Sequence, residues 1–133
     1  METRENLLLT RVRAFIEQNL GNPDLRPATI AAHHHMSVRA LHLLFRTQPE
    51  TVAALIRRRR LERCRADLGD PRLRHRTIGE ISARWGFRAL ADFSRAFRAA
   101  YGVPPSELRR AAHGLPAVPC ATCQAFLRSV PTT

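Results

Sequence analysis

The sequence predicts an all-α protein of about seven helices, arranged as two helix-turn-helix subdomains joined by a long linker helix. Three observations lead to this expectation. Apolar residues recur at three- and four-residue steps, as on the buried stripe of an amphipathic helix. Proline, glycine and capping residues separate these stretches at short intervals. Finally, the pattern of residues 27–46 returns in residues 78–100.

The first helix-turn-helix subdomain is expected over residues 5–50. Its opening helix runs from Glu5 to Leu20 and is stopped by Gly21 to Pro23. A shorter helix follows from Pro27 to about His33, with the proline at the first position, where its missing N–H costs nothing. Arg26 precedes it and is a poor N-cap, so this helix depends on packing.

A turn around His34 to Met36 leads to a third helix, which Ser37 caps and which reaches roughly Arg46. Its apolar face consists of Val38, Leu41, Leu44 and Phe45. The linker helix, residues 51–69, runs from Thr51 to Leu68, and Gly69 to Pro71 end it. Its inward residues are expected to be Val52, Leu55, Ile56, Leu61, Cys64 and Leu68, with Cys64 as a small buried hydrophobe.

The second subdomain, residues 70–112, starts its first helix at Ile78, because Thr77 to Glu80 form a capping box. That helix carries Ile81 and Ala83 and breaks at Trp85-Gly86-Phe87, where Gly86 can adopt the left-handed conformation of a tight turn. Another helix spans about Ala89 to Ala100, with one face made of Leu90, Phe93 and Phe97. A last helix starts at Pro104-Pro105 and ends near Ala112, and residues 113–133 are expected to be a flexible tail.

The charge points to a polyanionic partner. The chain has 22 basic and 11 acidic residues, a net charge of +11 and a pI near 11.6. Every basic residue among the 22 is arginine. Arginine suits the bidentate binding of phosphate and guanine, although an all-arginine composition is also what a GC-rich genome produces.

Several classes are excluded or disfavoured. No apolar stretch approaches the length of a membrane span, and the N-terminus lacks a signal-peptide pattern, so a cytoplasmic protein is expected. We find no set of nucleophile, base and orienting residue and no phosphate-binding glycine loop, so no enzyme and no cofactor are expected. His33 to His35 are consecutive and do not converge on one metal ion, and Cys120-x-x-Cys123 is half of a zinc pattern; no metal site is expected.

The candidate binding residues lie on the outward rows of the second helix of each pair, the helix that enters the DNA major groove in a helix-turn-helix. Ser37 and Arg88, near the starts of these helices, complete the set. The first row is Arg39, His42, Leu43 and Arg46, and the second is Ala91, Ser94, Arg95 and Arg98. At ~1.5 Å per residue, the linker helix is long enough to hold the two rows near one DNA turn apart.

Two further groups allow two interpretations each. The arginines of the linker helix, Arg57 to Arg60 with Arg63 and Arg65, either neutralise phosphates or form a solvated face paired with Glu62 and Asp67. The aromatic side chains either stack on bases or form core, and their spacing favours core. These are Trp85, Phe87, Phe93 and Phe97.

The segment TIGEISARWGFRALADFSRAFRAAYGVPPSELRR, residues 77–110, resembles the second helix-turn-helix signature of the AraC/XylS family of regulators. The Gly-Phe turn, the Phe-Ser-Arg-Ala-Phe-Arg helix and the Tyr-Gly-x-x-Pro ending stand at that family's spacing. Upstream, TIAAHHHMSVRALHLLFR and IRRRRLERCRADL resemble its first unit and connecting helix. The resemblance covers about residues 5–110.

The resemblance implies a sequence-specific transcriptional regulator whose two recognition helices enter consecutive major-groove segments of double-stranded promoter DNA. By position, the base-facing residues would be Arg39, His42 and Leu43 in the first unit, and Ala91, Ser94 and Arg95 in the second. Two positions depart from the commoner pattern. Leu43 stands where a basic or polar residue is frequent; it can touch a thymine methyl but offers no hydrogen bond. His35 stands where glycine often makes the turn.

Family members usually carry a separate sensory domain ahead of this module, for which Met1 leaves no room. A stand-alone regulator, a shortened product and a fragment are all compatible with this length. Without such a domain we expect a monomer with no small-molecule effector. The alternative function is a protein-interaction module that docks an acidic partner such as RNA polymerase, which is also a possible partner of the regulator.

Overall fold

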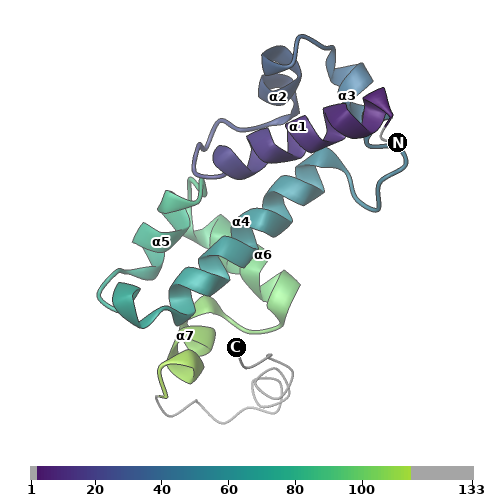
Figure 1. Ribbon diagram of the computed structural model, residues 1–133. Coiled ribbons are helices and arrows are strands. Elements are labelled where there is room, and N and C mark those ends of the chain that lie inside the picture. The colour runs from purple at the N-terminus through teal and green to yellow at the C-terminus, as the bar shows by residue number, and fades with distance from the viewer. Residues whose placement is uncertain (1–2, 115–133) are drawn as a thin grey trace. The chain divides into compact units, whose positions relative to one another are not determined.

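The computed structural model describes residues 3–114 and is all-helical over that range, which confirms the predicted fold class (Figure 1). The predicted tail lies almost entirely outside the described residues. Seven α-helices and one short 3-10 helix are formed: α1 (Arg4–Gln18), α2 (Pro27–His33), α3 (Val38–Leu44), α4 (Val52–Gly69), η1 (Pro71–Leu73), α5 (Ile78–Arg84), α6 (Leu90–Tyr101) and α7 (Pro105–Ala112).

Two compact units divide the chain, Met1–Arg60 and Leu61–Thr133, and each takes about half of α4. The predicted inward face of α4 is confirmed along its whole length. Its six residues are all buried: Val52, Leu55, Ile56, Leu61, Cys64 and Leu68. The first three belong to the core of the first unit and the last three to the core of the second.

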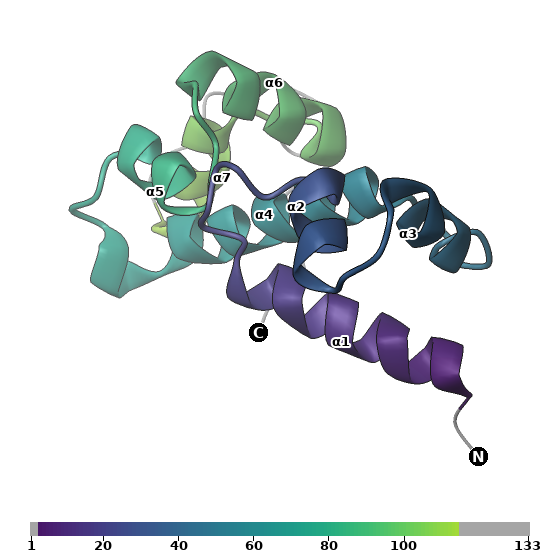
Figure 2. The ribbon, with the colours of Figure 1, turned by 90° about the horizontal axis from the view of Figure 1, so that it is seen from above.

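In the first unit, α2 and α3 pack against each other and α2 lies beside α1 (Figure 2). Helix α1 buries Leu9, Val12 and Ile16, and its N-terminus is capped by the Thr3 hydroxyl, which accepts from the Asn6 N–H at 3.2 Å. This helix ends at Gln18, two residues earlier than predicted. Helix α2 starts at Pro27 without a side-chain cap, as expected with Arg26 at the N-cap position, and it buries Ile30 and Ala31.

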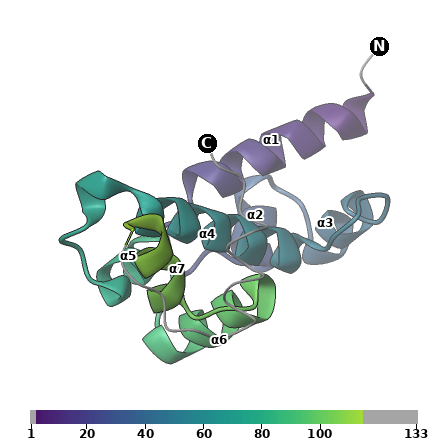
Figure 3. The ribbon, with the colours of Figure 1, turned by 90° about the horizontal axis from the view of Figure 1, so that it is seen from below.

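In the second unit α5, α6 and α7 pack against the C-terminal half of α4 (Figure 3). Its core is a single cluster, and the predicted assignment of the four aromatic side chains to core is confirmed. Phe93 and Phe97 are completely buried, while Trp85 and Phe87 pack against the cluster. The other members are Leu61, Cys64, Leu68, Ile81, Ala96, Val103 and Leu108.

The same helix-ending turn closes α2 and α5. In the first unit the Met36 N–H bonds to the Ala31 carbonyl at 2.9 Å and the His35 N–H to the Ala32 carbonyl at 3.2 Å. The second unit repeats both bonds, from Phe87 to Ser82 and from Gly86 to Ala83. This is the Schellman pattern, whose C′ residue is left-handed. That residue is Gly86 with φ 90° and, without glycine's freedom, His35 with φ 55°.

Some side-chain assignments were wrong. Helix α3 ends at Leu44, so Arg46 lies just beyond it rather than within it. Val38 and Leu90, assigned to inner faces, are both exposed because they are the first residues of their helices, before the packed turns begin. In α5 the buried partner of Ile81 is Ser82, whose hydroxyl donates to the Gly79 carbonyl at 3.0 Å, whereas Ala83 faces solvent.

Candidate nucleic-acid interface

Helix α3 presents the first predicted row to solvent. Its start is fixed by Ser37, whose hydroxyl accepts from the Ala40 N–H at 3.0 Å, and its inner side is held by Leu41 and Phe45, which are buried. Arg39 and Leu43 are four residues apart and therefore share a surface row. The exposed members of the predicted set in this unit are Ser37, Arg39, His42, Leu43 and Arg46.

The second predicted row lies on α6. Phe93, Ala96 and Phe97 are buried. The ring of Phe93 packs against that of Phe87, with centroids 5.0 Å apart, and the ring of Phe97 packs against that of Tyr101, with centroids 4.7 Å apart. Burial of this side directs the other side of the helix outward. Ala91, Arg95 and Arg98 are exposed, Ser94 is half-buried, and Arg88 is exposed in the preceding turn.

The arginines of the two rows differ in whether a carboxylate pairs with them. Arg95 forms an ion pair with Asp92 one turn earlier on α6, and both side chains are largely exposed. Such an exposed pair contributes less than about 1 kcal/mol and is readily exchanged for a stronger anionic partner. Among residues 3–114, Arg39, Arg46 and Arg98 have no carboxylate partner. Both rows thus offer donors that a phosphate or a base edge can take up.

The basic run of α4 is not a uniform solvated face. Arg58 pairs with Glu50 at 2.6 Å, and its hydrogen bonds lower the pKa of that carboxyl below its ordinary value. Arg59 pairs with Glu17 on α1. Arg60 donates to the Leu20 carbonyl at 2.9 Å and the Asn22 carbonyl at 2.6 Å, and so ties α4 to the loop after α1.

In the N-terminal half of α4, Arg58 and Arg59 thus have acidic partners in other segments, Glu50 and Glu17, which neither interpretation of the sequence included. Asp67 instead serves the second helix-turn-helix. Its carboxylate accepts from the Trp85 indole N–H at 2.7 Å and lies 3.6 Å from Arg84. Arg63 and Arg84 also lie over the Trp85 ring, 5.6 and 5.4 Å from its centroid. These contacts hold the turn that leads into α6.

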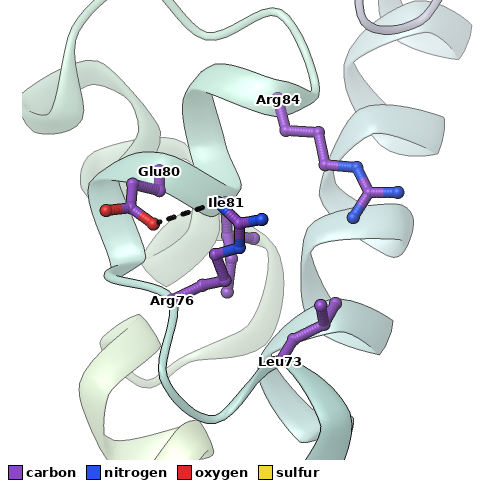
Figure 4. Close-up of a pocket in the computed structure, with 5 residues that line it drawn as sticks. All are labelled: Leu73, Arg76, Glu80, Ile81 and Arg84. Carbon is purple, nitrogen blue, oxygen red and sulfur yellow. Dashed lines mark ion pairs between the residues drawn. The ribbon is translucent and has the colours of Figure 1, made fainter.

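A shallow hollow of about 360 Å³ lies beside α5, lined by Leu73, Arg76, Glu80, Ile81 and Arg84 (Figure 4). Arg76 faces Glu80 at 3.8 Å, as the dashed line in Figure 4 marks. The Thr77 hydroxyl accepts from the Glu80 N–H at 3.0 Å, which is one half of the predicted capping box; the Glu80 carboxylate pairs with Arg76 and does not form the other half. None of the residues that line the hollow comes from α6, so it is separate from the outward row of that helix.

The histidines of the first turn pack with an aromatic ring. His33 stacks on Phe15 with centroids 4.0 Å apart, and His34 meets the edge of the same ring at 5.4 Å. Burial lowers the pKa of His34. Within residues 3–114 no group of three His, Cys, Asp or Glu side chains is placed to hold a metal ion. Cys120 and Cys123 lie outside the described residues. None of the helices in the same range is long and apolar enough to cross a membrane.

Comparison with known proteins identifies this architecture. The family described as "Helix-turn-helix domain" matches residues 30–111, more than half of the chain. The XylDLEGF operon transcriptional activator of Pseudomonas putida is 37% identical over 109 residues, which are 81% of this chain and 34% of that protein. The chain belongs to the AraC/XylS family of helix-turn-helix proteins. It carries the DNA-binding domain of that family.

Another AraC/XylS-type relative is the transcriptional activator NphR of a Rhodococcus species, 38% identical over 102 residues, or 77% of this chain and 30% of that protein. The C-terminal domain of AraT, a response regulator from Geobacillus stearothermophilus, has the same fold, with a TM-score of 0.74 and 24% identity over 88% of this chain and 92% of that one. The chain spans between about a fifth and a third of the length of the first curated relatives.

Within this AraC/XylS domain, two residues close to the second row were not among the binding residues predicted from the sequence. Leu90 begins α6 and is exposed, and Asp92 holds the Arg95 guanidinium. A signal for Leu90 was present, because a shift of 52 positions aligns every predicted outward residue of α3 with one of α6 and also aligns Leu90 with Val38. The signal for Asp92 was its three-residue spacing from Arg95.

Proposed function

We propose that this protein is a sequence-specific transcriptional regulator that reads two consecutive major-groove segments of promoter DNA. One observation carries the proposal: in each unit an identical helix-ending turn leads into a helix whose inner side is buried and whose outer side carries exposed arginine. A major groove admits one α-helix, and the outward residues of that helix meet the base edges.

The chemistry of the rows supports a division of labour. Arg39 begins the first outward row and Arg95 lies third in the second, and at either place a guanidinium can donate two parallel hydrogen bonds to the O6 and N7 of guanine. Arg46 and Arg98 lie at the far ends of the same rows, where contacts to phosphate oxygens fix the register. With a net charge of +11, binding should weaken steeply as salt rises, because each neutralised phosphate releases counterions.

We expect Asp92 to lower the affinity of the second row for DNA. Its carboxylate holds the Arg95 guanidinium in the free protein, and on binding it faces a polyanion. Because the pair is exposed, its exchange for a base contact costs less than about 1 kcal/mol. Removal of the carboxylate should therefore tighten binding to all sequences and leave the order of preference unchanged.

The test is a gel-shift titration with the full chain on sites selected from random duplexes. Arg95→Ala should weaken the best site by about 1–3 kcal/mol and relax the preference at one base pair of one half-site. Arg110→Ala, which removes an exposed arginine of α7 that belongs to neither row, is the matched charge control. If Arg95→Ala and Arg110→Ala weaken every sequence equally, Arg95 makes only a charge contact. If no duplex is selected, the proposal fails.

The remaining parts of the proposal concern the wider setting. We propose that the chain acts as a monomer in the cytoplasm, where promoter DNA is found, and that RNA polymerase is its second partner, because the matched relatives are named as transcriptional activators. The alternative, a module that only docks an acidic protein, requires that binding to RNA polymerase be insensitive to competitor DNA. Sedimentation of the free chain checks the monomer.

A further inference from the structure

Exposed apolar side chains are concentrated on the two recognition helices. Among residues 3–114 the large apolar side chains that are exposed are Leu7, Val38, Leu43 and Leu90. Three of these four lie on α3 or α6, and Leu43 and Leu90 are each 51% exposed. Single exposed leucines are ordinary on protein surfaces, but a concentration on the two helices that face a ligand indicates contact with an apolar part of that ligand.

The positions of these side chains correspond between the two units. Val38 is the first residue of α3 and Leu90 the first residue of α6. Counted from those starts, Leu43 in the first unit occupies the place of Arg95 in the second. Leu43 also lies one turn after Arg39 on the same row. On α3 the apolar Leu43 thus lies beside a charged residue of the outward row, whereas Val38 and Leu90 are exposed at the first positions of their helices.

The ligand chemistry follows from the groove. Each thymine presents its C5 methyl group in the major groove, and apolar side chains recognise this methyl there. The first turn of a recognition helix is the part that reaches base edges, and Val38 and Leu90 lie in that turn. An apolar side chain that is flanked by arginines suits a thymine next to phosphates better than it suits a purely apolar protein surface.

We infer that Val38, Leu43 and Leu90 contact thymine methyl groups and select A·T base pairs in both half-sites. The inference rests on the proposed function and adds the base chemistry that these side chains select. It also makes the two half-sites unequal. Leu43 and Arg95 occupy equivalent positions in α3 and α6, so at that position the first unit contacts thymine and the second unit contacts guanine.

The first experiment removes single methyl groups from the DNA and compares the protein with two leucine variants. After selection of sites from random duplexes by the full chain, each thymine is replaced singly by deoxyuridine, which removes one methyl group. Loss of one such contact should weaken binding about fourfold. Leu43→Ala should bind the thymine and uracil duplexes equally at the position that it contacts, and Leu90→Ala should do so in the other half-site. Both side chains are exposed, and circular dichroism of each variant checks that its helices are kept.

A further variant tests the difference between the two units through a change of base preference. Leu43→Arg gives the first unit the residue that the second unit has, so its preference at that pair should move from A·T to G·C by about tenfold. Specific binding without any uracil effect, or with uracil effects that both leucine variants retain, overturns the inference and leaves the proposed function standing. Failure to select any site overturns the proposed function itself, and the exposed leucines would then belong to a protein contact.

Discussion

The contact between Trp85 and Asp67 should be a main support of the second helix-turn-helix. The indole N–H donates to a carboxylate oxygen at 2.7 Å, and the Asp67 side chain is only 16% exposed. A hydrogen bond to a charged group contributes about 1.5–3 kcal/mol, and the more exposed Arg84 pair adds less than about 1 kcal/mol. We expect Asp67→Ala to lower the free energy of unfolding by about 2–3 kcal/mol.

The assay is urea denaturation followed by fluorescence. Trp85 and Tyr101 are the only tryptophan and tyrosine and both belong to the second unit, so their emission reports the unfolding of that unit. Asp67→Asn is the matched control, because it keeps an acceptor oxygen and loses the charge; it should cost about 1 kcal/mol. Trp85→Phe, read through Tyr101, completes a double-mutant cycle with Asp67→Ala. A coupling energy below about 0.5 kcal/mol would refute the assigned role of this hydrogen bond.

Two further predictions concern the turn of the first unit. His35→Gly should stabilise the protein by up to about 1 kcal/mol and His35→Val should destabilise it, because a φ of 55° strains a β-branched residue most; the opposite order in urea denaturation would contradict the left-handed turn. Burial, His33, Arg11 and His35 lower the pKa of His34 below 6.5, so its neutral form is favoured on folding. Its contribution to stability is complete above pH 6.5 and is lost as the pH falls toward its folded pKa. In His34→Phe the free energy of unfolding, measured by urea denaturation, should fall less as the pH is lowered. Equal pH profiles of the variant and the unchanged protein would contradict this prediction.

Periodicity and capping residues were sufficient to locate the seven α-helices of residues 3–114, but not the short 3-10 helix η1. Pro27, Ser37 and Thr77 each act within one turn of the chain, so their effect does not depend on the rest of the fold, and the helices start where these residues place them. The inward face of α4 was also predictable, since a helix that is buried on one side must repeat apolar residues at its own period. The outward rows followed from the same period.

Contacts between distant residues were decided by the tertiary structure. Arg59 and Glu17 are 42 positions apart, and Trp85 and Asp67 are 18 apart, so no local pattern connects them. Helix ends were the other uncertainty. Leu90 and Val38 fit an apolar stripe by spacing, but the first residue of a helix projects before the packed turns and can stay in solvent. Local chemistry sets where a helix begins and which side is apolar, whereas only packing decides which apolar side chains are left over for a ligand.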